Sequence, residues 1–247
     1  MYGYPLVNAN VPTLKSTLFG GKSSLYNGLL SVYKAESNAN DSFGANNGTA
    51  NGGLTYATGI NGNAFTFNGT NSYVSLPANS MNFNGDYSIS SWVYVPSSYI
   101  GTSQIVILCN EYTATFFNNP YGFYLTTIGN SIYHETHVGT NTTTNLIASF
   151  TFTQGSWNHI VYTRKKSTRS RIYVNGTLIN SDTNTIDPVY SITHNPTIGA
   201  EYLNGAIHDK SIASSSIDEL YLWIKELTSI EVTTLYNSGT GKFYPTF

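Results

Sequence analysis

The acidic residues of this chain are few and widely spaced, which limits the acid–base chemistry that the sequence predicts. Retaining glycoside hydrolysis needs two carboxyl groups about 5–5.5 Å apart, whereas Glu111, Glu135 and Glu201 are scattered along the chain. Asp218 and Glu219 are adjacent, so on a strand their side chains would point to opposite faces. We therefore expect a protein that is not an enzyme.

The histidines and the cysteine offer no better catalytic pattern. His134-Glu-Thr-His137 superficially resembles a zinc motif, but metalloproteases place histidines at i and i+4 on a helix. On a strand, which the local composition favours, these two side chains would face opposite ways. His159 lies in the same predicted strand as Trp157 and is expected to be structural, and Cys109 ends an apolar run in which it should be buried and inert.

Aromatic and basic residues could instead bind a sugar. The chain has 20 tyrosines, and exposed aromatic rings stack on sugar rings while their polar tips hydrogen-bond. One basic run, residues 164–171, stands out from a chain in which charged residues make up only 10%. Two alternatives remain open: the aromatic residues could be ordinary core residues, and the basic run could be a solvated hairpin loop. The candidate glycan-binding residues are Tyr112, Phe116, Phe117, Tyr121, Tyr124, Lys165 and Arg169.

The overall charge and the chain start restrict the setting of the protein. A net charge of -2 provides no global field to attract nucleic acid or an anionic membrane, and no apolar stretch reaches the ~18 residues of a membrane span. The surface composition is typical of exported or virion proteins, yet the first residues lack the pattern of a secretory signal. Release by host-cell lysis within a virus particle would reconcile these observations, as would earlier removal of an export signal.

Turn and strand signals predict an all-β domain. Asn68-Gly69 and Asn175-Gly176 each separate two stretches of alternating apolar residues and predict hairpins. Residues 87–95 and 156–163 have the aromatic and β-branched content of central strands. Many short strands with such turns favour a two-sheet antiparallel β-sandwich.

A single helix is predicted near the end of the chain. Thr228 and Glu231 have the spacing of a capping box, with Leu227 and Val232 placed to form a hydrophobic staple. Residues 237–239, Asn-Ser-Gly, should then end the helix.

The two ends of the chain together resemble the opening and closing strands of a laminin-G-like domain, a concanavalin A-like jelly roll. This resemblance implies an all-β jelly roll with one short C-terminal helix, preceded by an N-terminal arm or anchor over residues 1–27 and extending over 28–247. Residues 97–150 match no part of the family that we identify, and we expect them to hold variable recognition loops. The matching segments are residues 28–49, 62–77, 87–93, 155–161, 171–176, 196–199 and 217–236.

The same resemblance implies a structural calcium ion. Members of this family often bind Ca²⁺ with two aspartates, which here would be Asp41 and Asp218. Asn40 and Asn47 could add oxygen ligands, which calcium prefers. The alternative is that Asp41 caps its own turn and that Asp218 merely ends a strand.

A last resemblance concerns biological setting. Residues 235–245 are similar to the C-terminal tail of laminin-G-like domains in bacteriophage structural proteins. We therefore expect a non-enzymatic virion protein, a capsid decoration or a tail or fibre component, that displays a glycan-binding jelly roll. Its expected partners are other virion proteins through the arm, a cell-surface glycan and further copies of itself, with no nucleic acid and no membrane insertion. The alternative is a secreted bacterial carbohydrate-binding or adhesion module.

Overall fold

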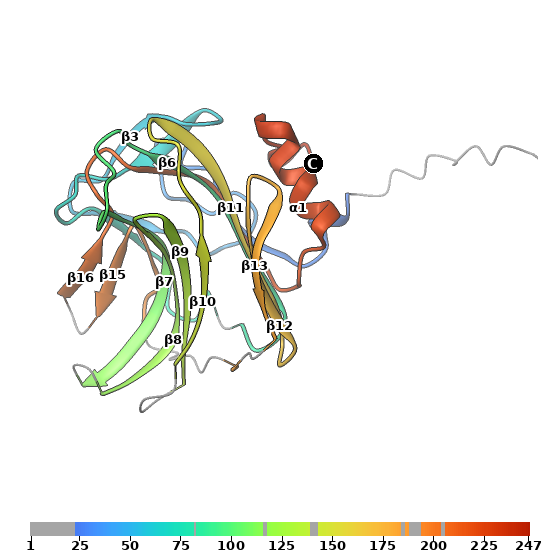
Figure 1. Cartoon of the computed structure of the whole chain (residues 1–247). Coiled ribbons are helices and arrows are strands. Elements are labelled where there is room, and N and C mark those ends of the chain that lie inside the picture. The colour runs from blue at the N-terminus through green and yellow to red at the C-terminus, as the bar shows by residue number, and fades with distance from the viewer. Residues whose placement is uncertain are drawn as a thin grey trace, which may run out of the picture.

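The computed structural model describes residues 23–81, 83–115, 118–138, 143–183, 186–187, 194–203 and 206–247. For residues 112–115, 118–121, 138, 143–144 and 202–203 the description covers the backbone alone. The described strands form two large antiparallel sheets and one small one (Figure 1).

The first sheet, sheet A, has eight strands. In spatial order these are β13 (Thr177–Asp182), β12 (Arg169–Val174), β11 (Ser156–Lys165), β6 (Tyr87–Val95), β17 (Ser216–Trp223), β4 (Asn63–Thr66) and β3 (Thr55–Thr58), with β1 (Leu29–Tyr33) also paired to β17.

The second sheet, sheet B, has seven strands, and a two-stranded hairpin lies beside it. In spatial order the strands of sheet B are β10 (Thr143–Ser149), β9 (Ser131–Val138), β8 (Asn118–Ile128), β7 (Gln104–Thr115), β14 (Thr197–Ile198), β5 (Tyr73–Ser75) and β2 (Thr49–Asn51). The hairpin consists of β15 (Ala200–Leu203) and β16 (Ala206–Lys210), and both of its strands contact β7.

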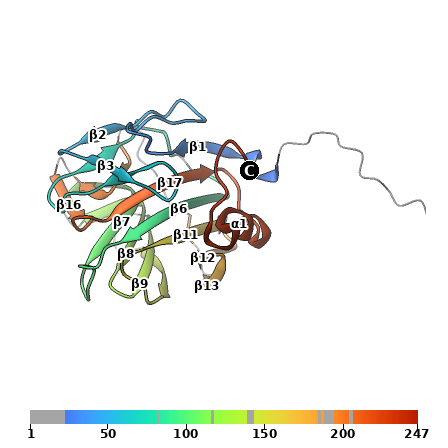
Figure 2. The same ribbon diagram turned by 90° about the horizontal axis from the view of Figure 1, so that it is seen from above.

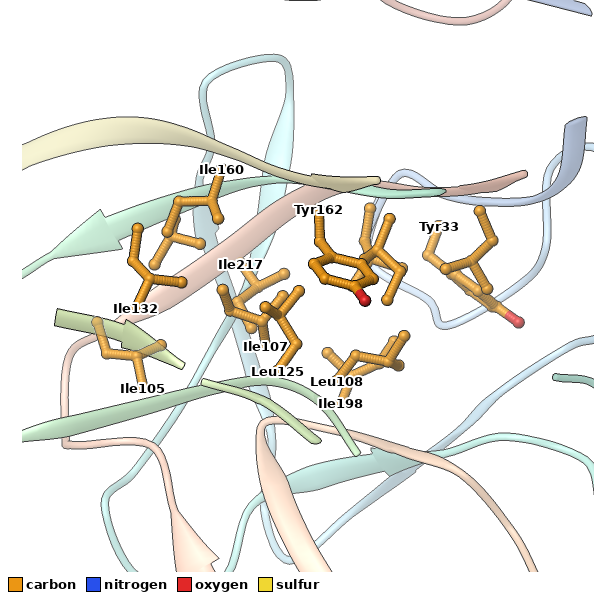
Figure 3. Packing of buried hydrophobic residues seen from close by; sticks show 14 of the residues in the cluster. Tyr33, Ile105, Ile107, Leu108, Leu125, Ile132, Ile160, Tyr162, Ile198 and Ile217 are labelled. Atoms are coloured by element: carbon orange, nitrogen blue, oxygen red, sulfur yellow. The ribbon is translucent and has the colours of Figure 1, made fainter. Parts of the chain in front are cut away.

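The main core lies between the inner faces of the two large sheets. Figure 3 shows Ile105, Ile107 and Leu125 of sheet B facing Ile160 and Ile217 of sheet A, and all five side chains are at most 1% exposed. Apolar burial of this kind contributes roughly 25 cal/mol per Å². It is the main force that holds the two sheets together.

One short helix, α1 (Ser229–Tyr236), covers part of the outer face of sheet A (Figures 1 and 2). The predicted capping box is present, because the Thr228 hydroxyl accepts from the Glu231 N–H and the Glu231 carboxylate accepts from the Thr228 N–H. The staple residues Leu227 and Val232 are both buried, and Asn237 ends the helix in a left-handed conformation (φ 47°). The predicted C-terminal helix is confirmed.

Only one of the two predicted hairpins forms. Asn175 and Gly176 both have positive φ and join β12 to β13 as expected. The prediction for Asn68-Gly69 was wrong, because β4 pairs within sheet A whereas β5 pairs within sheet B. The Asn68 side chain accepts hydrogen bonds from three following N–H groups, so this turn carries the chain from one sheet to the other.

Residues 97–150, which were expected to hold variable recognition loops, are mainly strands, and residues 116–117 and 139–142 lie outside the described residues. Most of this stretch forms the long strands β7 to β10, which are four of the seven strands of sheet B. Residues 105–109 are continuously apolar because one face of β7 packs in the core and the other lies under β15. A strand covered on both faces lacks the alternating pattern by which half-exposed strands are recognised.

The start and the end of the described chain lie against each other. The short 3-10 helix η1 (Ser24–Tyr26) buries Leu25, and the Trp223 indole N–H donates to the Leu25 carbonyl at 2.8 Å. The Tyr26 hydroxyl donates to the Pro245 carbonyl, beyond a second 3-10 helix, η2 (Asn237–Gly239). Residues 24–26 of the predicted arm therefore pack against the domain. Residues 1–22 of the arm lie outside the described residues. No helix in the described ranges is long and apolar enough to span a membrane.

Candidate functional site

Asp41, the first predicted calcium ligand, is bound to the backbone of its own loop and of strand β1. Its Oδ1 accepts from the N–H groups of Val32, Phe43 and Gly44 at 2.9–3.0 Å, and its Oδ2 accepts from Asn46 at 3.2 Å. Four N–H donors match the roughly four lone-pair positions of a carboxylate. This geometry corresponds to the alternative in which Asp41 caps its turn.

The two predicted asparagine ligands lie in the same loop. Asn47 accepts from the Asp41 N–H through its side-chain oxygen at 3.0 Å. Asn40 is exposed, and its own N–H donates to the Asn38 side chain. Asn47 therefore supports the loop conformation, while Asn40 faces solvent.

Asp218, the second predicted calcium ligand, is completely buried and is bound to a different loop. Its Oδ2 accepts from the Asn61 N–H at 3.1 Å and its Oδ1 from the Glu219 N–H at 2.7 Å. A Cβ at Gly59 would lie 2.3 Å from Oδ2, so a glycine there lets the loop approach the carboxyl group. Burial raises the pKa of Asp218 to about 8. The calcium site stays a prediction.

The predicted aromatic residues do not form an exposed cluster among the described side chains. Tyr124 is 5% exposed, and its hydroxyl accepts from Gln104 at 2.6 Å and donates to Asp209 at 3.3 Å. Tyr112 and Tyr121 are paired across β7 and β8, and their side chains are not described. Phe116 and Phe117 lie outside the described residues. Tyr124 is therefore a covered residue of sheet B.

The basic run is largely paired within the chain. Arg169 places Nε and Nη2 each 2.8 Å from the Glu226 carboxylate, and Arg171 lies 3.3 Å from the same group. Arg164 is buried and bound to Asp187. Lys165 remains exposed at the end of β11. A bidentate contact of this kind fixes the orientation of a guanidinium. Arg169 therefore links the β11–β12 turn to the segment that follows β17.

A groove with two aromatic rings lies on the outer face of sheet A. Val93 and Val95 of β6 point into the core, so Tyr94 between them points outward. Trp157 is its register partner on β11, and the two ring centroids are 5.5 Å apart at an angle of 57°. Both rings are partly exposed.

Hydroxyl groups complete this groove, which has a volume of about 360 Å³. Ser216 of β17 is opposite Tyr94, and Thr66 of β4 is opposite Ser216, so the four side chains form a row across four strands. The Thr66 and Ser216 hydroxyls are 2.9 Å apart. All lining residues are uncharged: Ala57, Thr58, Thr66, Tyr94, Trp157, Ser214 and Ser216.

The groove begins where the cover of α1 ends. On the same face, Trp92 and His159 are adjacent to Tyr94 and Trp157 along their strands, and Tyr236 of α1 stacks on both of them. Trp92 and His159 are consequently buried, at 3% and 1% exposure. Both strands follow from the local sequence pattern, but the groove does not, because strand register decides which side chains become neighbours.

A second cluster, of carboxyl groups around His137, lies on the outer face of sheet B. Glu111 of β7 and His137 of β9 are both in register with Gly122 of the intervening β8. Their side chains meet over this glycine, with Glu111 Oε1 2.8 Å from His137 Nε2. Glu135 Oε2 is 3.5 Å from the same nitrogen. As expected, His134 faces the other way, into the core, where it contacts Tyr87.

The electrostatics of this cluster are strongly perturbed. Burial alone would lower the pKa of His137, but the adjacent Glu111 and Glu135 carboxylates outweigh it and raise the pKa to about 9. Glu201 of β15 lies against this group, and burial followed by the charges of Glu111 and Asp209 raises its pKa well above the usual range. Glu111, Glu135 and Glu201 are scattered along the sequence, but antiparallel pairing and the β15–β16 hairpin bring them together in the structure.

Comparisons with known proteins agree with this architecture. The family model of the concanavalin A-like lectin/glucanases superfamily, Laminin_G_3, matches residues 68–233. No curated protein sequence matches the chain.

Among solved structures, the binding domain of Paraclostridial Mosquitocidal Protein 1 is similar with a TM-score of 0.69 and 18% identity, over 85% of this chain and 52% of that one. The binding domain of botulinum neurotoxin DC in complex with SialylT gives a TM-score of 0.67 and 16% identity, over 87% and 52%. The chain thus spans about half the length of these structures, and identities this low show a shared fold. From the family match and the two-sheet architecture, the chain belongs to the concanavalin A-like lectin/glucanase superfamily.

Proposed function

We propose that this protein is a non-catalytic glycan-binding module and that its sugar site is the groove around Tyr94 and Trp157. The proposal rests on the row of two partly exposed aromatic rings and two hydroxyl groups across four strands of sheet A. Aromatic faces pack against the C–H surface of a sugar ring, while hydroxyl groups exchange hydrogen bonds with its polar edge. Both kinds of contact are available here on a rigid sheet.

The chemistry of the groove favours a neutral sugar. None of its seven lining residues carries a charge, so an anionic sugar would lose water without gaining an ionic partner. A volume of about 360 Å³ lies at the lower end of small-molecule sites. We therefore expect recognition of one or two terminal neutral sugar units of a longer glycan.

The absence of carboxyl groups from the groove lining supports binding without hydrolysis. The carboxyl groups of the His137 cluster lie on the other sheet, and Glu111 and Glu201 are only 4% and 8% exposed. Retaining glycosidases hold two carboxyl groups about 5–5.5 Å apart on either side of a bound sugar. Two buried carboxyl groups in contact with each other leave no space for a sugar between them.

The similar toxin domains supply context for this proposal. One of them was solved in complex with SialylT, and a structure of botulinum neurotoxin type C concerns cell entry that is dependent upon interaction with two ganglioside molecules. Those statements concern domains about twice as long as the matched region. The sugar site proposed here therefore rests on the residues of this chain.

Binding to a glycan array, followed by calorimetric titration with the best neutral ligand, tests the proposal. Trp157→Ala and Tyr94→Ala should each weaken binding about tenfold, which corresponds to about 1.4 kcal/mol. Tyr133→Ala is the matched control, because Tyr133 is a partly exposed aromatic residue on the other sheet. Unchanged affinity in both groove variants, or release of free sugar from the ligand, would contradict the proposal.

For the biological setting, we propose display on a bacteriophage virion, with an extracellular bacterial adhesion module as the alternative. The support comes from the sequence: few charged residues, the composition of residues 1–27, which predicts an arm, and a closing stretch over residues 235–245 that resembles phage proteins. Mass spectrometry of purified particles would detect the protein if it belongs to a virion. Light scattering of the purified protein would test the expected homo-oligomer.

A further inference from the structure

The cluster of Glu111, Glu135 and His137 has the ligand set of a metal site. Each residue offers one oxygen or nitrogen atom, and these three atoms lie within 4.8 Å of one another. Among the described residues, this is the one such group of three or more histidine, cysteine, aspartate or glutamate side chains. The proposed sugar groove is on the other sheet, so this cluster has no part in it.

Gly122 of β8 lies in register between Glu111 of β7 and His137 of β9. Neighbouring strands are about 4.8 Å apart, so Glu111 and His137 start about two strand spacings from each other. Gly122 lies between them with φ 111°, and a Cβ there would be 1.8 Å from the Asn110 carbonyl oxygen. A larger residue at this position would therefore collide with the β7 backbone directly before Glu111.

The contact between Glu111 and His137 is an ion pair without a well-aligned hydrogen bond. Glu111 is 4% exposed, and its Oε1 lies 2.8 Å from Nε2 of His137. This oxygen nevertheless has no hydrogen bond of normal geometry in the described part of the chain. An unsatisfied carboxylate oxygen away from water costs free energy, and a cation between the two side chains would satisfy it.

We propose that Glu111, Glu135 and His137 bind a divalent transition-metal ion of the Zn²⁺ class. One imidazole nitrogen with carboxylate oxygens suits zinc and its neighbours, whereas calcium takes oxygen ligands. Two ligand atoms bound to zinc at about 2.05 Å in tetrahedral geometry are about 3.3 Å apart. The observed separations of 2.8 Å and 3.5 Å from His137 Nε2 lie on either side of this value.

Neighbouring groups would support the ion and leave it accessible. Glu201, on the β15–β16 hairpin beside β7, lies against Glu111, in the place of an outer carboxyl group that orients a metal ligand. Glu135 and His137 are partly exposed, so the ion can enter from solvent. Three protein ligands leave a fourth position for water or for an oxygen atom of a ligand.

Calorimetric titration of the chelator-treated full chain with ZnCl₂ tests the proposal. We expect one Zn²⁺ per chain, and a rise in melting temperature of about 5 °C or more at a free concentration 100 times the Kd. His137→Ala should weaken binding at least 100-fold and Glu135→Gln at least tenfold. His208→Ala removes an exposed histidine of β16 outside the cluster and should bind Zn²⁺ as the wild type does.

The outcomes are separable from those of the sugar experiment, because the Zn²⁺ titration and the melting measurements use no glycan. If His137→Ala fails to fold without metal, the partly exposed Glu135→Gln replaces it as the deciding variant. The proposal is overturned if the wild type takes up no Zn²⁺, or if the deciding variant binds it as tightly as the wild type.

Discussion

His159 allows a quantitative prediction about acid stability. Its ring is 1% exposed and lies beneath α1, 5.0 Å from the Trp92 ring and 6.2 Å from Tyr236. Its Nε2 is 2.8 Å from the Ser90 hydroxyl. Burial lowers the pKa of His159 to about 3. In the unfolded chain the same side chain titrates near its ordinary value of 6.5.

The sign and size of the effect follow from this difference. Between pH 6.5 and pH 3 the unfolded state binds a proton at His159 that the folded state does not, so the free energy of unfolding falls as the pH falls. The loss approaches about 1.36 kcal/mol per pH unit, or about 2–3 kcal/mol between pH 6.5 and pH 4.5. For a chain of this size that corresponds to about 5–10 °C in melting temperature.

The assay is thermal unfolding, followed by circular dichroism, of the wild type and of His159→Phe at both pH values. Phenylalanine keeps a ring in contact with Trp92 and Tyr236 but cannot take up a proton. The melting temperature of the variant should therefore fall by about 5–10 °C less than that of the wild type, while the titration of all other groups is common to both. His208→Asn, at an exposed histidine, should keep the wild-type pH dependence. Equal pH dependence in the wild type and in His159→Phe would refute the reasoning.

Three further predictions concern the cap of the helix, the glycine of the cluster and calcium. Thr228→Ala removes the hydroxyl that caps α1 and should lower the free energy of unfolding by about 1 kcal/mol in urea titrations; an unchanged midpoint would contradict this. Gly122→Ala places a methyl group 1.8 Å from a carbonyl oxygen at positive φ, so a loss of about 3 kcal/mol or more is expected by the same method, and full stability would show that the strand relaxes freely. If Asp41 and Asp218 bind calcium, the melting temperature in CaCl₂ should exceed that in chelator through mass action. This difference should disappear in Asp218→Asn. Equal melting temperatures of the wild type in CaCl₂ and in chelator would refute calcium binding at these residues.

Local sequence patterns predicted those parts of the fold that depend on neighbouring residues. The capping box of Thr228 and the Asn175-Gly176 hairpin form as expected because their hydrogen bonds and backbone angles involve residues a few positions apart. Asn68-Gly69 has the same turn chemistry but joins strands of different sheets. The turn residues themselves do not reveal which strand the next segment will pair with.

The candidate sites could not be predicted in the same way. Tyr94 and Trp157 are 63 positions apart, and Glu111 and His137 are 26 positions apart; each pair becomes adjacent through antiparallel register. The predicted residue Tyr124 lies on the same face as Glu111 but under β16, where it contacts Asp209. Residues 105–109, by contrast, form the buried strand that their continuous apolar run predicts, and Cys109 is buried as expected.

The amino-acid sequence alone determined the class of fold, the terminal helix and the family resemblance, since these follow from local hydrogen bonding, apolar patterning and motif order. Tertiary structure decided which side chains form the two candidate sites. Strand register made Tyr94 and Trp157 neighbours, and the end of the α1 cover left them partly exposed. Pairing of β7 and β9 with the intervening β8 brought Glu111 to His137. Side chains become a site when distant strands bring them to the same face, and long-range pairing is not specified by any short segment.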